Sequence, residues 1–219
     1  MFMMAQVEVG HGCSISMTGA VLPALRDQPP LAAIWEPRIR TNSYDYRMIN
    51  PAEKSGCLLG MGLTERQGGS DLRANSSTAA PAPEEGEDCY HLTGHKWFTS
   101  APMCDAFLVL ANSPRGLSCF LVPRVLSDGT LNSISLMRLK DKLGNRSNAS
   151  SEIEYDNAKG WIVGEEGRGI PTIIKMVNAT RIDCTTWAVA LMRQAVAQAG
   201  WHVSNRSAFG RTLVDQPLM

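Results

Sequence analysis

Two short segments of this 219-residue sequence carry residues that suit a flat, phosphate-bearing ligand. Residues 63–71 read Leu-Thr-Glu-Arg-Gln-Gly-Gly-Ser-Asp, and residues 94–100 read Gly-His-Lys-Trp-Phe-Thr-Ser. The first segment offers hydroxyls and a Gly-Gly pair, where backbone N–H groups can approach a ligand because no Cβ intervenes. The second offers the ring of Trp97 beside the hydroxyls of Thr99 and Ser100. Taken singly, each has an ordinary explanation: a turn between strands, and a tryptophan buried in a sheet core.

Together the two segments resemble the acyl-CoA dehydrogenase flavoproteins. The middle β-domain of that family carries a Thr-Glu-Pro-x-Ala-Gly-Ser-Asp segment and, about one strand pair later, a Lys-x-Trp-x-Thr/Ser segment. Here Arg66 replaces the proline and Gly68 replaces the alanine. These departures, together with residues 94–100 and 138–150, resemble the AidB branch of the family, whose members belong to the alkylation-damage response. The resemblance extends over nearly the whole chain.

The resemblance implies that this flavoprotein-like chain contributes to an FAD site. Thr64 is expected at the edge of the isoalloxazine ring and Ser70 near the pyrophosphate. Trp97 is expected to lie against the ring, and Thr99 or Ser100 to donate a hydrogen bond near N5, which would stabilise the reduced flavin. Without the resemblance, the hydroxyls of the first segment would simply close a turn. The implied FAD contacts are Leu63, Thr64, Gly69, Ser70, Trp97, Phe98, Thr99, Ser100, Arg206 and Phe209.

A third segment implies contact with the substrate. Residues 178–181 read Asn-Ala-Thr-Arg and match the family segment that contacts acyl-CoA. Asn178 and Arg181 are therefore expected to bind acyl-CoA or a related small molecule. Asn178 stands where the family usually has an acid, so the sequence does not specify which acyl-CoA is bound. The alternative is a polar helix turn that faces solvent.

A fourth segment implies a homo-oligomer. Arg206, Phe209 and Gly210 match the Arg-x-x-Phe-Gly pattern of the family, in which the arginine reaches FAD bound by the partner subunit. The glutamine expected further along does not align, because Gln216 lies one place early and Pro217 takes its position. The resemblance therefore implies a dimer or tetramer for the full-length protein.

No residue of this chain matches the catalytic base of the family. Dehydrogenation of an acyl-CoA requires a carboxylate that removes the α-proton while the β-hydrogen leaves as hydride to flavin N5. In the family that glutamate lies in the C-terminal helices, and nothing before Met219 matches it. We expect an FAD-dependent oxidoreductase of the acyl-CoA dehydrogenase class, of which this chain alone is inactive. The alternatives are a flavin-bearing DNA-binding protein of the alkylation response with little turnover, and an inactive fragment.

Composition argues against several other classes of protein. Lysine plus arginine and aspartate plus glutamate are equal at 21 each, so this chain lacks the basic excess of a nucleic-acid binder. DNA binding would depend on the basic C-terminal region of the AidB branch, which lies beyond this chain. His91 and His95 are four residues apart on a strand pattern, which does not form a helical metal pair, so no metal site is predicted.

The cysteines and the N-terminus predict a location. Six cysteines occur without a Cys-x-x-Cys pair, which argues against a zinc site or a disulfide framework and favours a reducing compartment. The N-terminus has no charged region followed by an apolar run, and no stretch approaches the roughly 20 apolar residues of a membrane helix. The sequence predicts a cytoplasmic chain without a membrane partner.

Residue patterns predict where helices and strands lie. Residues 1–28 are partly helical and end at Pro29-Pro30, and 31–55 form a connecting segment. The glycine-rich residues 164–169 lack dinucleotide-binding spacing and instead form the turn that enters a helix reaching about residue 203. Short apolar or alternating runs predict strands at 57–63, 89–93, 106–111, 117–122, 132–137 and 151–155.

These elements predict an α+β fold in three regions. Residues 1–55 form the remnant of an N-terminal helical domain and a connector. Residues 56–164 form a central antiparallel β-barrel-like domain that carries the flavin contacts. Residues 165–219 form the start of a C-terminal helical bundle, because a long one-sided helix needs neighbouring helices.

Overall fold

The computed structural model describes residues 1–218 and contains two compact units. The barrel unit is Gly10–Thr180, and the C-terminal unit combines Met1–Val9 with the chain from Arg181 onward. The α+β fold class is confirmed, with helices before the strands in sequence and a long helix after them. The region boundaries at 55 and 164 stay a prediction. Met219, the last residue of the third predicted region, lies outside the described residues.

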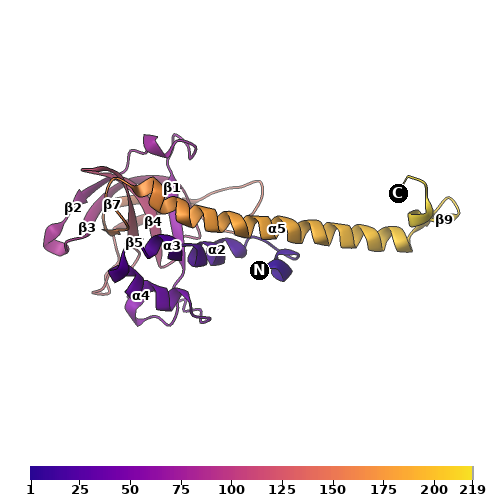
Figure 1. Cartoon of the computed structure of the whole chain (residues 1–219), viewed down its shortest axis with the longest axis horizontal. Coiled ribbons are helices and arrows are strands. Elements are labelled where there is room, and N and C mark those ends of the chain that lie inside the picture. The colour runs from indigo at the N-terminus through magenta and orange to yellow at the C-terminus, as the bar shows by residue number, and fades with distance from the viewer. Residues whose placement is uncertain (219) are drawn as a thin grey trace. The chain divides into compact units, whose positions relative to one another are not determined.

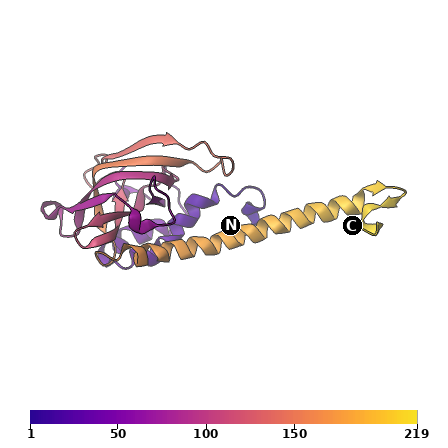
Figure 2. The ribbon, with the colours of Figure 1, turned by 90° about the horizontal axis from the view of Figure 1, so that it is seen from above.

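Seven strands of the barrel unit form one sheet, and five of them close into a ring. The ring closes because β1 pairs with β3 and β4, β4 with β5, β5 with β7, and β7 with β3. Most pairings are antiparallel, as predicted, while β1 and β2 both run parallel to β4. The strands, purple to salmon in Figure 1 and Figure 2, are β1 (Leu59–Thr64), β2 (Thr78–Pro81), β3 (Cys89–Ser100), β4 (Ala106–Ser113), β5 (Gly116–Pro123), β6 (Ile134–Leu139) and β7 (Ser150–Ile162).

Each of the six predicted strand segments overlaps a strand, and one strand of the barrel unit was missed. The missed strand is β2, whose sequence Thr-Ala-Ala-Pro has neither alternation nor large apolar residues. It forms because its backbone pairs with β3, from Thr78 opposite Thr93 to Pro81 opposite Tyr90. Strand β3 and strand β7 are longer than predicted, with 12 and 13 residues, and register shifts in β3 let the pair curve around the barrel.

Three helices pack against the barrel: α2 (Gly12–Ala20), α3 (Leu22–Leu25) and α4 (Pro29–Ile39) (Figure 1). The helical character of residues 1–28 is confirmed. The prediction that 31–55 is only a connector is wrong for its first residues, because Pro29 and Pro30 begin α4 instead of ending a helical segment. Proline fits the first turn of a helix, where its missing N–H has no intrahelical partner.

One hydrophobic core joins these helices to the barrel. Leu25 and Trp35 belong to the same buried cluster as Phe107 and Phe120. Residues 106–111 of β4 are all fully buried, the pattern of a strand that is covered on both faces. Thr18 of α2 accepts a hydrogen bond from the N–H of Leu59 at 2.9 Å, which fixes the helix to the start of β1.

The last helix, α5 (Gly169–Asn205), confirms the helix predicted after the glycine-rich turn. Its first residues belong to the barrel unit, where Ile173 and Met176 are fully buried. No helix in residues 1–218 combines the length and apolarity of a membrane span. Two short 3-10 turns of the barrel unit matter below: Pro51–Glu53 and Leu72–Ala74.

The C-terminal unit buries little of its apolar surface. It contains α1 (Phe2–Ala5), the rest of α5, and the hairpin of β8 (Ser207–Ala208) and β9 (Arg211–Thr212). Among its described residues only Ala5 and Ala190 are buried. Its large exposed apolar side chains include Ile182, Leu191, Met192, Val196, Trp201 and Phe209.

Candidate functional site

A β-bulge in β3 decides which way the second motif points. Lys96 pairs with Ile153 and Thr99 pairs with Ser151 of β7, so two residues of β3 stand opposite a single residue. The two residues in the bulge are Trp97 and Phe98. A bulge of this kind re-aims the side chains that follow it. As a result, both Lys96 and Thr99 are fully buried inside the barrel, although they are three residues apart.

The bulge places Phe98 and Ser100 on the outer side of the barrel. Phe98 is 41% exposed, and Ser100 is half-buried. Because successive strand residues point to opposite faces, Ser100 faces away from the interior that holds Thr99. Phe98 pairs with Thr64 of β1, which brings the two motifs together at this point.

The first motif also contains an irregularity, at Leu63. Gly62 pairs with Thr99 but Thr64 pairs with Phe98, so Leu63 is an extra residue in β1. After Thr64 the chain leaves the barrel wall in a segment that we call the glycine-rich loop, residues 66–75. A Cβ placed on Gly69 would lie 2.7 Å from Thr64 Oγ1, so this glycine permits the loop to fold back on Thr64. Thr64, Gly69 and Phe98 therefore lie together, and Ser70 follows Gly69 in the chain.

Trp97, the neighbour of Phe98 in the bulge, is surrounded by cations, and the ammonium of Lys140 also lies 4.6 Å from the centroid of the Phe98 ring. The ammonium of Lys140 is 3.2 Å from the centroid of the indole, and the guanidinium carbons of Arg66 and Arg138 are 5.6 and 5.7 Å from it. A flavin ring stacked on the face that Lys140 covers would have to displace that ammonium. Trp97 is the single predicted FAD contact that lines a cavity of about 510 Å³. The cavity is lined by Glu65, Arg66, Gln67, Ser76, His95, Trp97, Arg138, Glu152 and Glu154.

The hydroxyl of Thr99 points into the barrel, where it has no hydrogen-bond partner among the described residues. The hydroxyl of Tyr155 is likewise buried and unpartnered, and burial raises the pKa of this tyrosine. A Cβ on Gly62 would lie 2.9 Å from Thr99 Oγ1 and 3.6 Å from Tyr155 Oη. Of the two candidate donors near flavin N5, Thr99 therefore faces away from the outer surface and Ser100 does not.

Sequence reasoning missed the role of the charged residue in each motif. Lys96 Nζ donates to Glu65 Oε1 at 2.7 Å and to the carbonyl of Leu110 at 2.7 Å, inside the barrel. Burial alone would raise the pKa of Glu65, but the hydrogen bonds from Lys96, Ser76 and Ser77 lower it to about 2. Burial lowers the pKa of Lys96 against the attraction of Glu65. The signal available in the sequence was an acidic residue in one motif and a basic residue in the other.

Four further donors satisfy the carboxylate of Glu65. The backbone N–H and hydroxyl of Ser76 donate to Oε2 at 2.6 and 2.8 Å. The backbone N–H and hydroxyl of Ser77 donate to Oε1 at 3.1 and 2.6 Å. Hydrogen bonds to an ionised acceptor are stronger than neutral ones, so this carboxylate is the main polar anchor of the residues that follow the loop.

The predicted residues of α5 and the C-terminal hairpin are exposed. Asn178, in the barrel unit, and Arg181, in the C-terminal unit, are both residues of α5. Phe209 and Gly210 both have positive φ, 53° and 77°, which is typical of the two-residue turn of a hairpin. Phe209 is therefore held at the hairpin tip and is 98% exposed. Arg206 is exposed just before β8. Their roles toward acyl-CoA and a partner's FAD stay predictions.

Three domain descriptions match consecutive parts of the chain. The AidB N-terminal domain of adaptive response proteins matches residues 1–46, the acyl-CoA dehydrogenase middle domain matches 60–158, and the acyl-CoA dehydrogenase C-terminal domain matches 167–219. The chain belongs to the acyl-CoA dehydrogenase family. Within this family it is AidB-like, as the first motifs indicated.

The relatives that this chain matches are longer than the chain itself. It is 50% identical over 216 residues to the AidB protein of Escherichia coli strain K12, covering 98% of this chain and 39% of that protein. It is 32% identical to acyl-CoA dehydrogenase family member 11 of Caenorhabditis elegans, covering 94% of this chain and 34% of that protein. The chain thus spans well under half of these relatives.

Solved structures support the fold. The crystal structure of C. elegans ACDH-11 in complex with C11-CoA matches with a TM-score of 0.81 and 31% identity, covering 94% of this chain and 35% of that one. Butyryl-CoA dehydrogenase from Megasphaera elsdenii matches with a TM-score of 0.73 and 22% identity, covering 96% and 53%. The barrel and the start of the long helix are therefore the fold of this family.

Proposed function

We propose that this chain supplies the β-domain side of an FAD site in an acyl-CoA dehydrogenase-type oxidoreductase. The observation that carries the proposal is the group formed by Thr64, Gly69, Phe98 and Ser100 at the paired irregularities of β1 and β3. This group offers an exposed aromatic ring, two hydroxyls and a glycine that lets backbone approach closely. When bound, FAD accepts the β-hydrogen of the acyl group as a hydride.

Each residue of the group has a distinct task in this proposal. The exposed ring of Phe98 lies against the isoalloxazine, and Thr64 contacts its edge. The hydroxyl of Ser100 donates near N5, because that of Thr99 is enclosed in the barrel. The backbone N–H groups around Gly69 and Ser70 face the pyrophosphate, since no Cβ of residue 69 blocks their approach.

The proposal extends to ligands and partners outside the barrel unit. Asn178 and Arg181 contact an acyl-CoA; the C. elegans relative was solved with C11-CoA, which supports this class of ligand. Arg206 and Phe209 reach FAD of a partner subunit in a homo-oligomer. No disulfide joins the cysteines of residues 1–218, which supports a reducing compartment such as the cytoplasm. No residue of this chain is proposed as the catalytic base, so the chain alone is proposed to have no dehydrogenase turnover.

A second candidate function is a flavin-bearing, DNA-protecting protein of the alkylation response. The 50% identity with E. coli AidB favours it. The balance of 21 basic and 21 acidic residues gives this chain no charge excess for DNA. In this alternative the FAD site is retained and DNA binding depends on other parts of a longer protein.

Titration of the purified chain with FAD tests the proposal, with quenching of flavin fluorescence as the signal. We expect weak, saturable binding at one FAD per chain. Phe98→Ala and Ser100→Ala should weaken it, while Thr99→Val, a matched change inside the barrel, should leave it unchanged. Absence of saturable binding, or equal effects of Ser100→Ala and Thr99→Val, would contradict the proposed site.

A further inference from the structure

The carboxylate of Glu65 joins the two ends of the glycine-rich loop. Glu65 immediately precedes the loop, and its donors Ser76 and Ser77 immediately follow it. The ten residues between them form one short 3-10 turn and, through Gly68, an isolated bridge back to Glu65. One side chain therefore closes this segment with four hydrogen bonds, and its own backbone carbonyl accepts a fifth from Gly68 N–H at 3.0 Å.

The loop also has attachments of its own. Asn75 Nδ2 donates to the carbonyl of Leu63 at 3.0 Å, and Gln67 Nε2 donates to Asn75 Oδ1 at 3.1 Å. The loop residues Arg66, Gly69 and Ser70 are exposed or half-exposed. Leu72 packs against the hydrophobic core, and Asn112 Nδ2 donates to the carbonyl of Asn75 at 2.6 Å, so Glu65 closes the loop together with these contacts.

The charge of Glu65 is balanced from the opposite motif. The side chain of Lys96 is fully buried and that of Glu65 is 3% exposed, so the pair is sealed from water. A buried pair of this kind is costly to break, because removal of one partner leaves an uncompensated charge. Lys96 precedes the bulge that presents Phe98 and Ser100. The same ion pair thus connects the loop to the strand that carries the other half of the candidate FAD site.

We propose that Glu65, anchored by Lys96, is the positioning residue of the cofactor site. It holds the glycine-rich loop closed so that the N–H groups near Gly69 and Ser70 stay beside Thr64 and Phe98. Its effect on FAD rests on the proposed function, whereas its effect on the loop does not. Glu65 is not a catalytic residue in this proposal, because it contacts the loop and not the reacting atoms.

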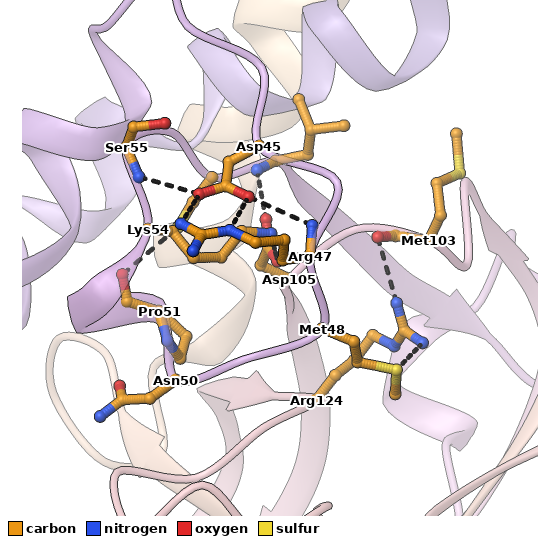
Figure 3. A network of polar contacts seen from close by, with 12 residues as sticks. Asp45, Arg47, Met48, Asn50, Pro51, Lys54, Ser55, Met103, Asp105 and Arg124 are labelled. Carbon is orange, nitrogen blue, oxygen red and sulfur yellow. Dashed lines mark hydrogen bonds and ion pairs between the residues drawn. The ribbon is translucent and has the colours of Figure 1, made fainter.

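A second buried ion pair in the same unit serves as a matched control. Lys54 Nζ donates to Asp105 Oδ1 at 2.5 Å, and the side chains are 3% and 13% exposed. Asp105 Oδ2 accepts from the N–H of Leu58 at 2.9 Å. Figure 3 shows this pair beside Asp45, which binds Arg47. These residues hold the connecting segment, residues 41–58, and none of them belongs to the glycine-rich loop.

Limited trypsin digestion without FAD tests the effect on the loop. Arg66 and Arg73 are cleavage sites inside the loop, and Arg47 is one inside the connecting segment. Cleavage of a transiently opened segment follows the population of its open form. Glu65→Gln should speed cleavage at Arg66 and Arg73 about tenfold, the factor that corresponds to about 1.4 kcal/mol, and leave Arg47 unchanged. Asp105→Asn should speed cleavage at Arg47 and leave cleavage at Arg66 and Arg73 unchanged.

Affinity for FAD tests the effect on the cofactor site. At a temperature where all variants are folded, Glu65→Gln should raise the dissociation constant about tenfold and Asp105→Asn should not change it. The flavin fluorescence of the saturated complex should also be less quenched in Glu65→Gln, a signature that general destabilisation would not produce. If the wild-type chain binds no FAD, the proposed function fails while the cleavage result still decides the role of Glu65.

Two further variants keep the test decisive if Glu65→Gln does not fold. Ser77→Ala removes one hydroxyl donor and should speed loop cleavage about threefold without unfolding the chain. The double variant E65Q/K96M removes both buried charges and should recover thermal stability while the loop stays cleavable. Wild-type cleavage rates at Arg66 and Arg73 in the double variant or in a folded Glu65→Gln protein would overturn the proposal.

Discussion

The two buried ion pairs of the barrel unit differ in what their carboxylates hold. Glu65 accepts four hydrogen bonds from Ser76 and Ser77 besides the ammonium of Lys96. Asp105 accepts one backbone N–H besides the ammonium of Lys54, and its side chain is 13% exposed. The first pair is sealed and closes a loop beside the candidate FAD site, whereas the second is partly hydrated and fixes a connecting segment.

This difference shows that a buried ion pair can position chain segments without adding much to the free energy of unfolding. A buried salt bridge is weak evidence for net stability, because desolvation offsets the attraction between the charges. The Glu65–Lys96 pair is better explained by geometry: it joins two strands and both ends of a loop at one point. The Lys54–Asp105 pair fixes a single segment to the barrel wall. Experiments that treat the two pairs alike can therefore separate positioning from stability.

The largest expected effect is the loss of Lys96. Lys96→Met leaves the carboxylate of Glu65 buried without its counter-ion and should lower the free energy of unfolding by about 3–5 kcal/mol. Lys54→Met should cost less, about 1–2 kcal/mol, because Asp105 keeps its backbone donor and some contact with water. Urea unfolding at pH 7 measures both. Equal losses of unfolding free energy in Lys96→Met and Lys54→Met would contradict the proposed difference between the two ion pairs.

The next largest effect is a dependence of the free energy of unfolding on pH. The pKa of Glu65 is about 2 in the folded chain against an ordinary value of 4.5. Because folding lowers this pKa, the carboxylate contributes its full stability above about pH 4.5 and loses it as the pH falls toward 2. The contribution is about 3 kcal/mol.

Unfolding of the wild type and of Glu65→Gln between pH 7 and pH 2 measures this contribution. Glu36 also has a lowered pKa of about 2, caused first by its hydrogen bond from Arg26. That group is present in both proteins, so its titration cancels in the difference between them. A difference that stays constant over this range would show that Glu65 does not titrate with folding.

The sequence was sufficient to predict the barrel and the long helix. It was not sufficient to predict on which side of the barrel wall the side chains of the candidate site lie. Apolar runs such as 106–111 and the glycine-rich turn before α5 follow directly from local patterns. The side of the barrel on which Thr99 lies does not, because it depends on a bulge that forms only when β3 pairs with β7. Simple alternation would place Trp97 and Thr99 on one face.

Two other features needed tertiary information. Strand β2 has no pattern of its own and exists because β3 supplies its partner. Pro29 and Pro30 can end one helix or begin the next, and packing of Trp35 in the core decides for the second. The role of Glu65 was hidden for a similar reason: its five donors come from two other parts of the chain, Ser76-Ser77 and Lys96.

A smaller effect is expected from buried hydroxyls of the barrel unit, which differ in whether they have a hydrogen-bond partner. Tyr155 Oη is buried with no partner among the described residues, and an unsatisfied buried hydroxyl costs about 1–3 kcal/mol. Tyr155→Phe should therefore raise the free energy of unfolding by about 1 kcal/mol, whereas Ser77→Ala should lower it by a similar amount. Urea unfolding measures both. Destabilisation by Tyr155→Phe would indicate that a buried water binds this hydroxyl and that of Thr99.

The smallest expected effect compares how strongly Glu65 and Trp97 each keep the glycine-rich loop closed. Arg66 is the loop residue whose guanidinium lies 5.6 Å from the centroid of Trp97. An exposed cation–π contact contributes about 0.5–1 kcal/mol, so Arg66→Gln should speed trypsin cleavage at Arg73 by only about two- to fivefold. Trp97→Leu should give the same increase, and the two changes together should add little. An increase as large as that from Glu65→Gln would mean that Trp97 holds the glycine-rich loop closed as strongly as Glu65 does.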